Sequence, residues 1–277
     1  MLAVSPRSLD EAIRQLSENP QLRPVAGCTD LLVADPDQIA SLPGVIDLLS
    51  VPELRGIRWV SETLEIGATT TFSEIGTAKT VRQNFPSLAE AASQIGGWQI
   101  QNRATLGGNM ANASPAGDSL PVLLALDAAV VLVGPEGERT IAYSEFHTGY
   151  RETAMLPGEI IARIRLPRPR PDTVQLFRKI GTREAHAISK VVVALSGRVD
   201  EGEIVEYRLG AGSVAAIPMR LTAVEEAVVG RSTDAETADM AGRLAAESVE
   251  PIDDVRSTAA YRRFALERVV RRLTASL

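Results

Sequence analysis

Residues 105–121 read Thr105-Leu106-Gly107-Gly108-Asn109-Met110-Ala111-Asn112-Ala113-Ser114-Pro115-Ala116-Gly117-Asp118-Ser119-Leu120-Pro121, and the apolar run Val122-Leu123-Leu124-Ala125-Leu126 follows. Most of these residues are small, polar or turn-forming, so we expect a long loop with no secondary structure of its own. Well-patterned apolar segments on both sides argue against disorder, and ordered loops of this length usually carry function. We call residues 105–121 the second segment, because a shorter stretch of the same kind precedes them.

The polar groups of the second segment fit a dinucleotide. Glycine N–H groups suit phosphate, and hydroxyl or amide side chains suit the groups around it. The candidate partners are Thr105, Gly107, Gly108, Asn109 and Ser114. Asp118 offers a carboxylate to sugar hydroxyls, or it caps a helix that begins near Ser119; the two roles are compatible because a carboxylate has two oxygens.

Neither of the common phosphate-binding fingerprints is present. The chain contains no G-x-G-x-x-G, so it lacks the Rossmann signature. It also contains no G-x-x-x-x-G-K-[ST], which excludes a P-loop.

The first segment is Pro24-Val25-Ala26-Gly27-Cys28-Thr29-Asp30-Leu31. A short strand leads into a turn of small residues, where backbone N–H groups can approach an anion and Thr29 adds a hydroxyl. The alternative is an ordinary strand-to-helix turn with a glycine at positive φ.

Composition narrows the classes of protein. The chain has 277 residues, 45% of them hydrophobic, which is enough for a large core and excludes global disorder. Its net charge of −6 gives no attraction to nucleic acid. One cysteine and two histidines argue against an iron–sulfur cluster or a zinc site built by this chain. The sequence shows no signal peptide and no membrane span, so we expect a cytoplasmic protein.

Apolar periodicity and turn signals predict a mixed α+β chain. Three prolines in Pro167-Arg168-Pro169-Arg170-Pro171 predict an extended connector and a domain boundary. Helices are expected at about 8–18, from 71, and at 85–96, 220–229, 234–248 and 257–276. Strands are expected at 23–26, 44–48, 57–60, 63–68, 128–133, 139–141, 159–166, 174–180, 189–198 and 204–211.

The two segments together resemble a known family. "VAGCTDLL" (25–32) and "ATLGGNMANASPAGDSLPVLLALDA" (104–128) are similar to the two FAD-binding motifs of the flavoprotein subunit of molybdenum hydroxylases, such as carbon monoxide dehydrogenase and xanthine dehydrogenase. "GEIIARIRLP" (158–167) and "FRKIGTREAHAISKVVVAL" (177–195) extend the resemblance over essentially the whole chain.

This resemblance implies a fold and a division into domains. A two-lobed FAD-binding domain of the vanillyl-alcohol-oxidase type would occupy residues 1–170, with lobes at about 1–54 and 55–170. A smaller α+β C-terminal domain would occupy residues 173–277. FAD would lie extended between the lobes.

The resemblance also implies which residues bind the cofactor. The first segment would wrap the pyrophosphate, the second would contact the phosphate, ribityl and sugar groups, and Ile95, Ile161 and Lys179 match further contact positions. The full set is Pro24, Val25, Ala26, Gly27, Cys28, Thr29, Asp30, Leu31, Ile95, Thr105, Gly107, Gly108, Asn109, Ser114, Asp118, Ile161 and Lys179. Cys28 departs from the pattern, because the family usually has a second glycine there.

The function implied is electron transfer. FAD would be bound non-covalently, since neither His147 nor His186 lies in a matching motif. A large subunit would hold molybdopterin, a small subunit would carry two [2Fe–2S] clusters, and the whole would form a dimer of heterotrimers. We expect no catalytic residue and no metal in this chain. A free-standing FAD oxidoreductase, or a binding protein that has lost the flavin, are the alternatives.

Overall fold

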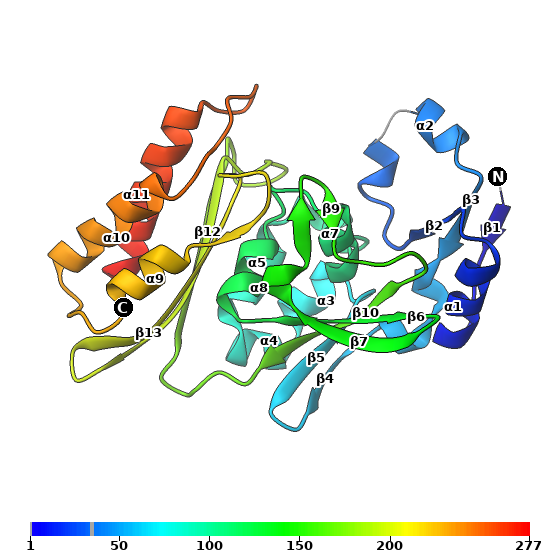
Figure 1. The fold of residues 1–277 in the computed structure, drawn as a ribbon, viewed down its shortest axis with the longest axis horizontal. Helices are drawn as coiled ribbons and strands as arrows, with labels where there is room; N and C mark the ends of the chain where they lie inside the picture. The colour runs from blue at the N-terminus through cyan, green and yellow to red at the C-terminus, as the bar shows by residue number, and fades with distance from the viewer. Residues whose placement is uncertain (1, 34–35) are drawn as a thin grey trace.

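The computed structural model describes residues 2–33 and 36–277. Three sheet-based units follow one another along the chain, and Figure 1 shows them side by side from the N-terminal unit (blue) through the central one (cyan to green) to the C-terminal one (yellow to red). No helix among the described residues is long and apolar enough to cross a membrane.

The N-terminal unit is a parallel three-stranded sheet in the order β1-β3-β2. Ser8 caps its main helix by accepting a hydrogen bond from the Glu11 N–H, as expected for a serine before an amphipathic run. Ala12, Leu16 and Ile46 are buried between helix and sheet. The elements are β1 (Leu2–Val4), α1 (Leu9–Glu18), β2 (Leu22–Val25), η1 (Leu31–Val33), α2 (Pro36–Ala40), β3 (Gly44–Asp47), η2 (Leu48–Ser50) and η3 (Pro52–Leu54).

The central unit is an antiparallel five-stranded sheet in the order β4-β5-β10-β6-β7, with helices packed against one face. A small hairpin, β8–β9, stands apart from this sheet. The elements are β4 (Ile57–Val60), β5 (Thr63–Gly67), α3 (Phe72–Thr77), α4 (Lys79–Asn84), α5 (Pro86–Gln94), α6 (Trp98–Gln101), α7 (Leu106–Asn112), α8 (Leu120–Ala125), β6 (Ala129–Gly134), β7 (Gly137–Ala142), η4 (Tyr143–Glu145), β8 (His147–Gly149), β9 (Glu152–Thr153) and β10 (Ile160–Pro167).

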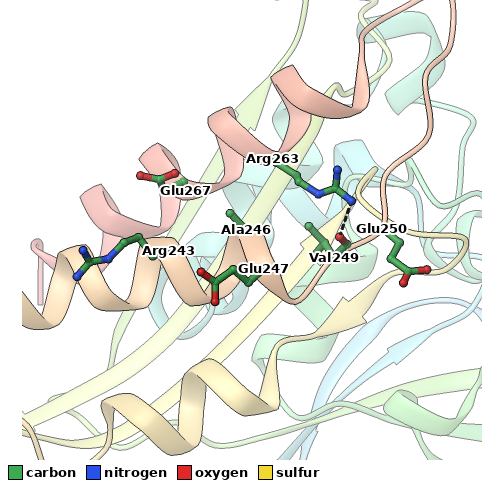
Figure 2. Close-up of a pocket in the computed structure, with 7 residues that line it drawn as sticks. All are labelled: Arg243, Ala246, Glu247, Val249, Glu250, Arg263 and Glu267. Carbon is green, nitrogen blue, oxygen red and sulfur yellow. Dashed lines mark hydrogen bonds between the residues drawn. The ribbon is translucent and has the colours of Figure 1, made fainter.

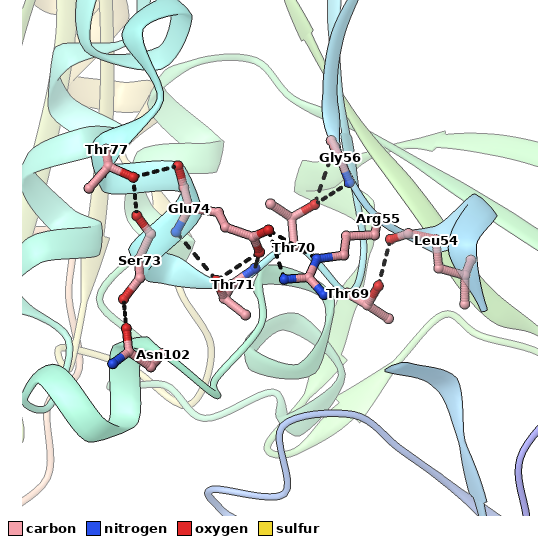
Figure 3. Close-up of polar contacts among 10 residues, drawn as sticks. All are labelled: Leu54, Arg55, Gly56, Thr69, Thr70, Thr71, Ser73, Glu74, Thr77 and Asn102. Atoms are coloured by element: carbon pink, nitrogen blue, oxygen red, sulfur yellow. Dashed lines mark hydrogen bonds and ion pairs between the residues drawn. The ribbon is translucent and has the colours of Figure 1, made fainter. Parts of the chain in front are cut away.

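A run of threonines joins these two units (Figure 3). The Thr69 hydroxyl donates to the Leu54 carbonyl at 2.9 Å, which ties the end of β5 to η3. Thr71 and Glu74 form a reciprocal capping box at the start of α3. Arg55 forms an ion pair with the Glu74 carboxylate at 2.8 Å, so the same carboxylate serves the cap and the junction.

The C-terminal unit is an antiparallel sheet in the order β11-β12-β13-β14. Side chains along β12 alternate between its faces: Val191, Val193 and Leu195 face the C-terminal helices, whereas Val192 and Ala194 join the core of the central unit. Figure 1 shows the three helices along the outer face. The elements are β11 (Val174–Ile180), β12 (Val191–Asp200), β13 (Glu203–Gly212), β14 (Met219–Arg220), α9 (Thr222–Val228), α10 (Ala235–Glu247) and α11 (Ala259–Thr274).

α8 is held between the central and C-terminal units. All six of its residues are buried. A Cβ at Gly210 on β13 would lie 2.1 Å from the Pro121 carbonyl oxygen, so only glycine allows β13 to approach so closely. The two units therefore share a continuous apolar core across this helix.

The predicted absence of secondary structure in residues 105–121 is wrong. Leu106–Asn112 forms α7, even though it contains two adjacent glycines. Thr105 caps the helix, and Leu106 and Met110 are fully buried beneath it. Each glycine in a helix costs about 1 kcal/mol relative to alanine, and the tertiary packing of these two side chains outweighs that cost.

Candidate functional site

The first segment forms a turn with unused N–H groups between β2 and η1. The N–H groups of Gly27, Cys28, Thr29 and Asp30 make no hydrogen bond to another residue that the structure describes. Cys28 has a φ of +58°, which is the left-handed conformation that favours glycine. A run of free N–H groups around one left-handed residue is the geometry of an anion-binding nest.

Gly27 brings the two segments together. A Cβ on Gly27 would lie 1.9 Å from the carbonyl oxygen of Arg103 and 3.0 Å from the Cα of Ala104. The first segment therefore rests directly on the backbone that leads into Thr105. Two stretches about eighty residues apart in the sequence meet at one place because this position has no side chain.

The glycines of the second segment have no free N–H group. Gly107 donates to the Ala68 carbonyl at 2.9 Å, and a Cβ there would lie 2.6 Å from the Cβ of Ala68. Gly108 donates to the Thr105 hydroxyl oxygen at 3.1 Å and is exposed on its other side. Gly107 is thus a packing residue, while Gly108 leaves an open surface.

Asn109 and Ser114 shape the second segment. The Ser119 hydroxyl donates to Asn109 Oδ1 at 2.7 Å, and Ser114 Oγ accepts from the Ala116 N–H at 3.3 Å. The side-chain NH₂ of Asn109 makes no hydrogen bond to another described residue, and Asn109 is partly exposed. It is therefore available to a ligand lying on α7.

Asp118 does not cap α8, so that predicted alternative is wrong. Its carboxylate accepts from Lys179 Nζ at 2.6 Å and also from the Ser189 hydroxyl. Lys179 donates in addition to the Gln94 carbonyl at 2.8 Å. Burial raises the pKa of Asp118, and the charge of Lys179 opposes that rise. This buried pair joins the second segment to β11 of the C-terminal unit.

The other two predicted residues lie in different environments. Ile95 ends α5 and is half-buried. Nearby, the His186 ring occupies the space that a Cβ on Gly97 would need, 2.2 Å from Nε2, so the β11–β12 connection rests on this turn. Ile161 is only 4% exposed and belongs to the core beneath the five-stranded sheet.

The sequence analysis missed Arg151, at the turn between β8 and β9. Its Nη1 donates to Asn112 Oδ1 at 2.9 Å and lies 4.0 Å from Asp30 Oδ2. It therefore reaches both the end of α7 and the first segment. Nothing in the spacing around Arg151 signals this role, because only the fold brings the hairpin over α7 (Figure 1).

His147 lies in the core and not in the candidate site. It is 7% exposed, and its Nε2 lies 2.9 Å from the Tyr143 hydroxyl. Burial lowers its pKa to about 4, so the ring stays neutral at pH 7.

Two hollows in the surface lie elsewhere. The larger, about 430 Å³, lies between α10 and α11, where the charged side chains of Arg243, Glu247 and Glu267 project around it (Figure 2). The smaller, about 190 Å³, lies beside the proline-rich connector at residues 167–170. None of the predicted cofactor residues lines either hollow.

Comparison with known proteins identifies the family. Residues 2–169 match the FAD binding domain in molybdopterin dehydrogenase, and residues 176–277 match the CO dehydrogenase flavoprotein C-terminal domain. Nicotinate dehydrogenase FAD-subunit of Eubacterium barkeri is 30% identical over 97% of this chain and 93% of its own length. Carbon monoxide dehydrogenase medium chain of Afipia carboxidovorans is 32% identical over 93% of this chain and 89% of its own.

Solved structures agree with the sequence matches. Carbon monoxide dehydrogenase from Hydrogenophaga pseudoflava superposes with a TM-score of 0.95 at 30% identity, covering 99% of this chain and 96% of that one. The matches to both parts of the chain and to the whole fold therefore indicate the same family. The chain belongs to the FAD-binding medium subunits of the molybdenum hydroxylases, a family of oxidoreductases.

Proposed function

We propose that this chain holds FAD non-covalently with the diphosphate on the first segment and the rest of the cofactor along the second. The observation that carries the proposal is the run of N–H groups at Gly27–Asp30 that bond to no residue in the described part of the chain, held against the residues just before Thr105. Each such N–H contributes roughly 1–2 kcal/mol as a charge-assisted hydrogen bond to phosphate. Thr105, Asn109 and the open side of Gly108 form the adjoining surface.

The other predicted contact residues keep their roles as part of this proposal. Asp118 and Lys179 hold each other at the inner end of the second segment, where a sugar hydroxyl is the expected partner. The edge of the cofactor site is proposed to consist of local backbone and apolar surface at Ser114, Ile95 and Ile161.

When bound, FAD supplies the redox chemistry, taking electrons from [2Fe–2S] clusters of a small partner subunit and passing them to an external acceptor. The residues of this chain bind and orient the cofactor. A large molybdopterin subunit would hydroxylate the substrate, and a dimer of heterotrimers in the cytoplasm would be the working assembly. Relatives named as medium chains or subunits support a multi-subunit complex.

We also propose the division into an FAD-binding domain at residues 1–170, with lobes at about 1–54 and 55–170, and a C-terminal domain at residues 173–277. The close approach of Gly210 to Pro121 and the Asp118–Lys179 pair support a fixed arrangement of the two domains. The C-terminal domain would then complete the inner end of the cofactor site.

The test is to purify the chain alone and together with the products of its neighbouring genes. We expect a yellow protein with FAD that is released on denaturation, and substrate oxidation only in the presence of molybdenum and iron–sulfur subunits. A chain that stays colourless after incubation with FAD would contradict cofactor binding. Substrate turnover by the chain alone would instead favour a free-standing FAD oxidoreductase.

A further inference from the structure

Two arginines of the central unit stand beside the first segment, and neither is among the residues predicted from the sequence. Arg103 precedes the second segment, and its backbone carbonyl lies against Gly27. Arg151 reaches over from the β8–β9 turn to within 4.0 Å of Asp30. The backbone of Arg103 thus lies at the Gly27 end of the first segment, and the side chain of Arg151 lies near its Asp30 end.

Both guanidinium groups have unused hydrogen-bonding capacity. The Arg103 side chain is exposed and makes no ion pair or hydrogen bond with another described residue. Among the described residues, Arg151 makes a short hydrogen bond to Asn112 alone, and its contact with Asp30 is long. A guanidinium has five N–H donors, so each of these arginines can still bind an anion.

The positive charge of Arg103 lies near enough to Cys28 to affect its thiol. Burial raises the pKa of the Cys28 thiol, and the positive charge of Arg103 works against that rise. A phosphate held by the N–H of Cys28 would therefore lie within the range of the same charge. The backbone nest contributes dipoles but no full charge, while Asp30 adds a negative charge that opposes an anion.

We propose that Arg103 and Arg151 form a two-armed clamp that closes on the diphosphate of the bound dinucleotide. This inference rests on the proposed function and adds the two cations that the nest at Gly27–Asp30 lacks. Arginine suits the task because its planar fork binds two phosphate oxygens at once. Without ligand, Asp30 and Asn112 hold Arg151; the phosphate replaces the long contact with Asp30.

The clamp also explains how the cofactor fastens the two lobes. The first segment belongs to the N-terminal unit, while both arginines belong to the central unit. A diphosphate gripped from both sides therefore links the lobes through its own charge. In this proposal Arg103 and Arg151 bind the cofactor and take no part in electron transfer.

The experiment measures the affinity of the full-length, flavin-depleted chain for FAD by titration at low and high salt. The variants are Arg103→Ala, Arg151→Ala and the double substitution, with Arg14→Ala on α1 and Arg82→Ala on α4 as controls that remove an exposed arginine elsewhere. Each clamp variant should weaken FAD binding about tenfold, and the double variant about a hundredfold. The loss should shrink at high salt because screening removes the same attraction.

A lysine in place of either arginine distinguishes charge from packing. Arg103→Lys and Arg151→Lys should recover part of the lost affinity, and all clamp variants should melt at the wild-type temperature without FAD. If both alanine variants bind FAD as tightly as the controls, the clamp is wrong while FAD binding stands. If the wild-type chain binds no FAD at any salt concentration, both the proposed function and the clamp are wrong.

Discussion

The two glycine segments look alike in the sequence but differ in what their backbones do. The first leaves the N–H groups of Gly27–Asp30 without a partner among the described residues, whereas the second uses those of Gly107 and Gly108 within the protein. Gly107 is required because Ala68 lies against it, and Gly27 because Arg103 lies against it. A glycine-rich motif therefore indicates close approach, but only an account of each hydrogen bond shows which stretch is open to a ligand.

The largest expected effect comes from removing Lys179, the cation on β11 that pairs with Asp118 of the second segment. Lys179→Met leaves the Asp118 carboxylate buried without its charged partner, which should cost about 3–5 kcal/mol of folding stability at neutral pH. Chemical denaturation of wild type and variant measures the difference. If the second segment is held by packing alone, the variant will unfold at the wild-type denaturant concentration.

The pH dependence of this variant sharpens the test. The folded pKa of Asp118 is already raised by burial, and losing Lys179 should raise it further. A carboxyl whose pKa is higher in the folded state stabilises the fold below its unfolded pKa, and that contribution is lost as pH rises through the folded pKa. Lys179→Met should therefore regain stability on acidification, and adding Asp118→Asn should remove this dependence.

Gly107→Ala is the next test, because it adds a side-chain atom where the second segment packs against Ala68. The new Cβ would lie 2.6 Å from Ala68 Cβ and 2.8 Å from the Ala68 carbonyl oxygen. We expect a loss of about 1–3 kcal/mol in unfolding free energy, as for other overpacked core sites. Gly76→Ala on α3 is the matched control, since its nearest neighbours are 3.7 Å away, and it should be neutral or stabilising.

Gly27→Ala should show the opposite pattern. The new Cβ would meet the Arg103 carbonyl at 1.9 Å and push the first segment away from the second; Gly27 is partly exposed and lies outside any helix or strand. We expect FAD affinity to fall at least about tenfold, equivalent to 1.4 kcal/mol, while the flavin-free melting temperature changes little. If Gly27→Ala lowers the unfolding free energy as much as Gly107→Ala does, the first segment is a packing site like the second, which contradicts the proposed difference.

Cys28→Gly should have the smallest effect. Cys28 has a φ of +58°, which costs a non-glycine residue roughly 1–2 kcal/mol, and glycine removes that strain while adding entropy to the unfolded chain. The net gain in unfolding free energy should stay under about 1 kcal/mol, with FAD affinity unchanged because the N–H groups remain. Loss of FAD from this variant would assign the thiol a role in the site.

Regular elements were predictable where side-chain periodicity was strong. β12 was expected at 189–198 and runs over Val191–Asp200, because alternating burial on both faces leaves a run of β-branched residues. α11 was expected at 257–276 and runs over Ala259–Thr274, because its apolar side chains recur at helical spacing. The prediction failed at α7, where glycine suggested a loop and burial of Leu106 and Met110 decided for a helix.

Within the site, the sequence was enough to identify the two unusual stretches, 24–31 and 105–121. Their many small residues can be recognised from residue type, without knowledge of any contact. Only the tertiary structure decided which N–H groups stay free, that Asp118 pairs with Lys179 and Ser189, and that Arg103 and Arg151 flank the first segment. The physical reason is that local patterns record propensity and polarity, whereas hydrogen-bond partners and charge neighbours come from residues far apart in the chain.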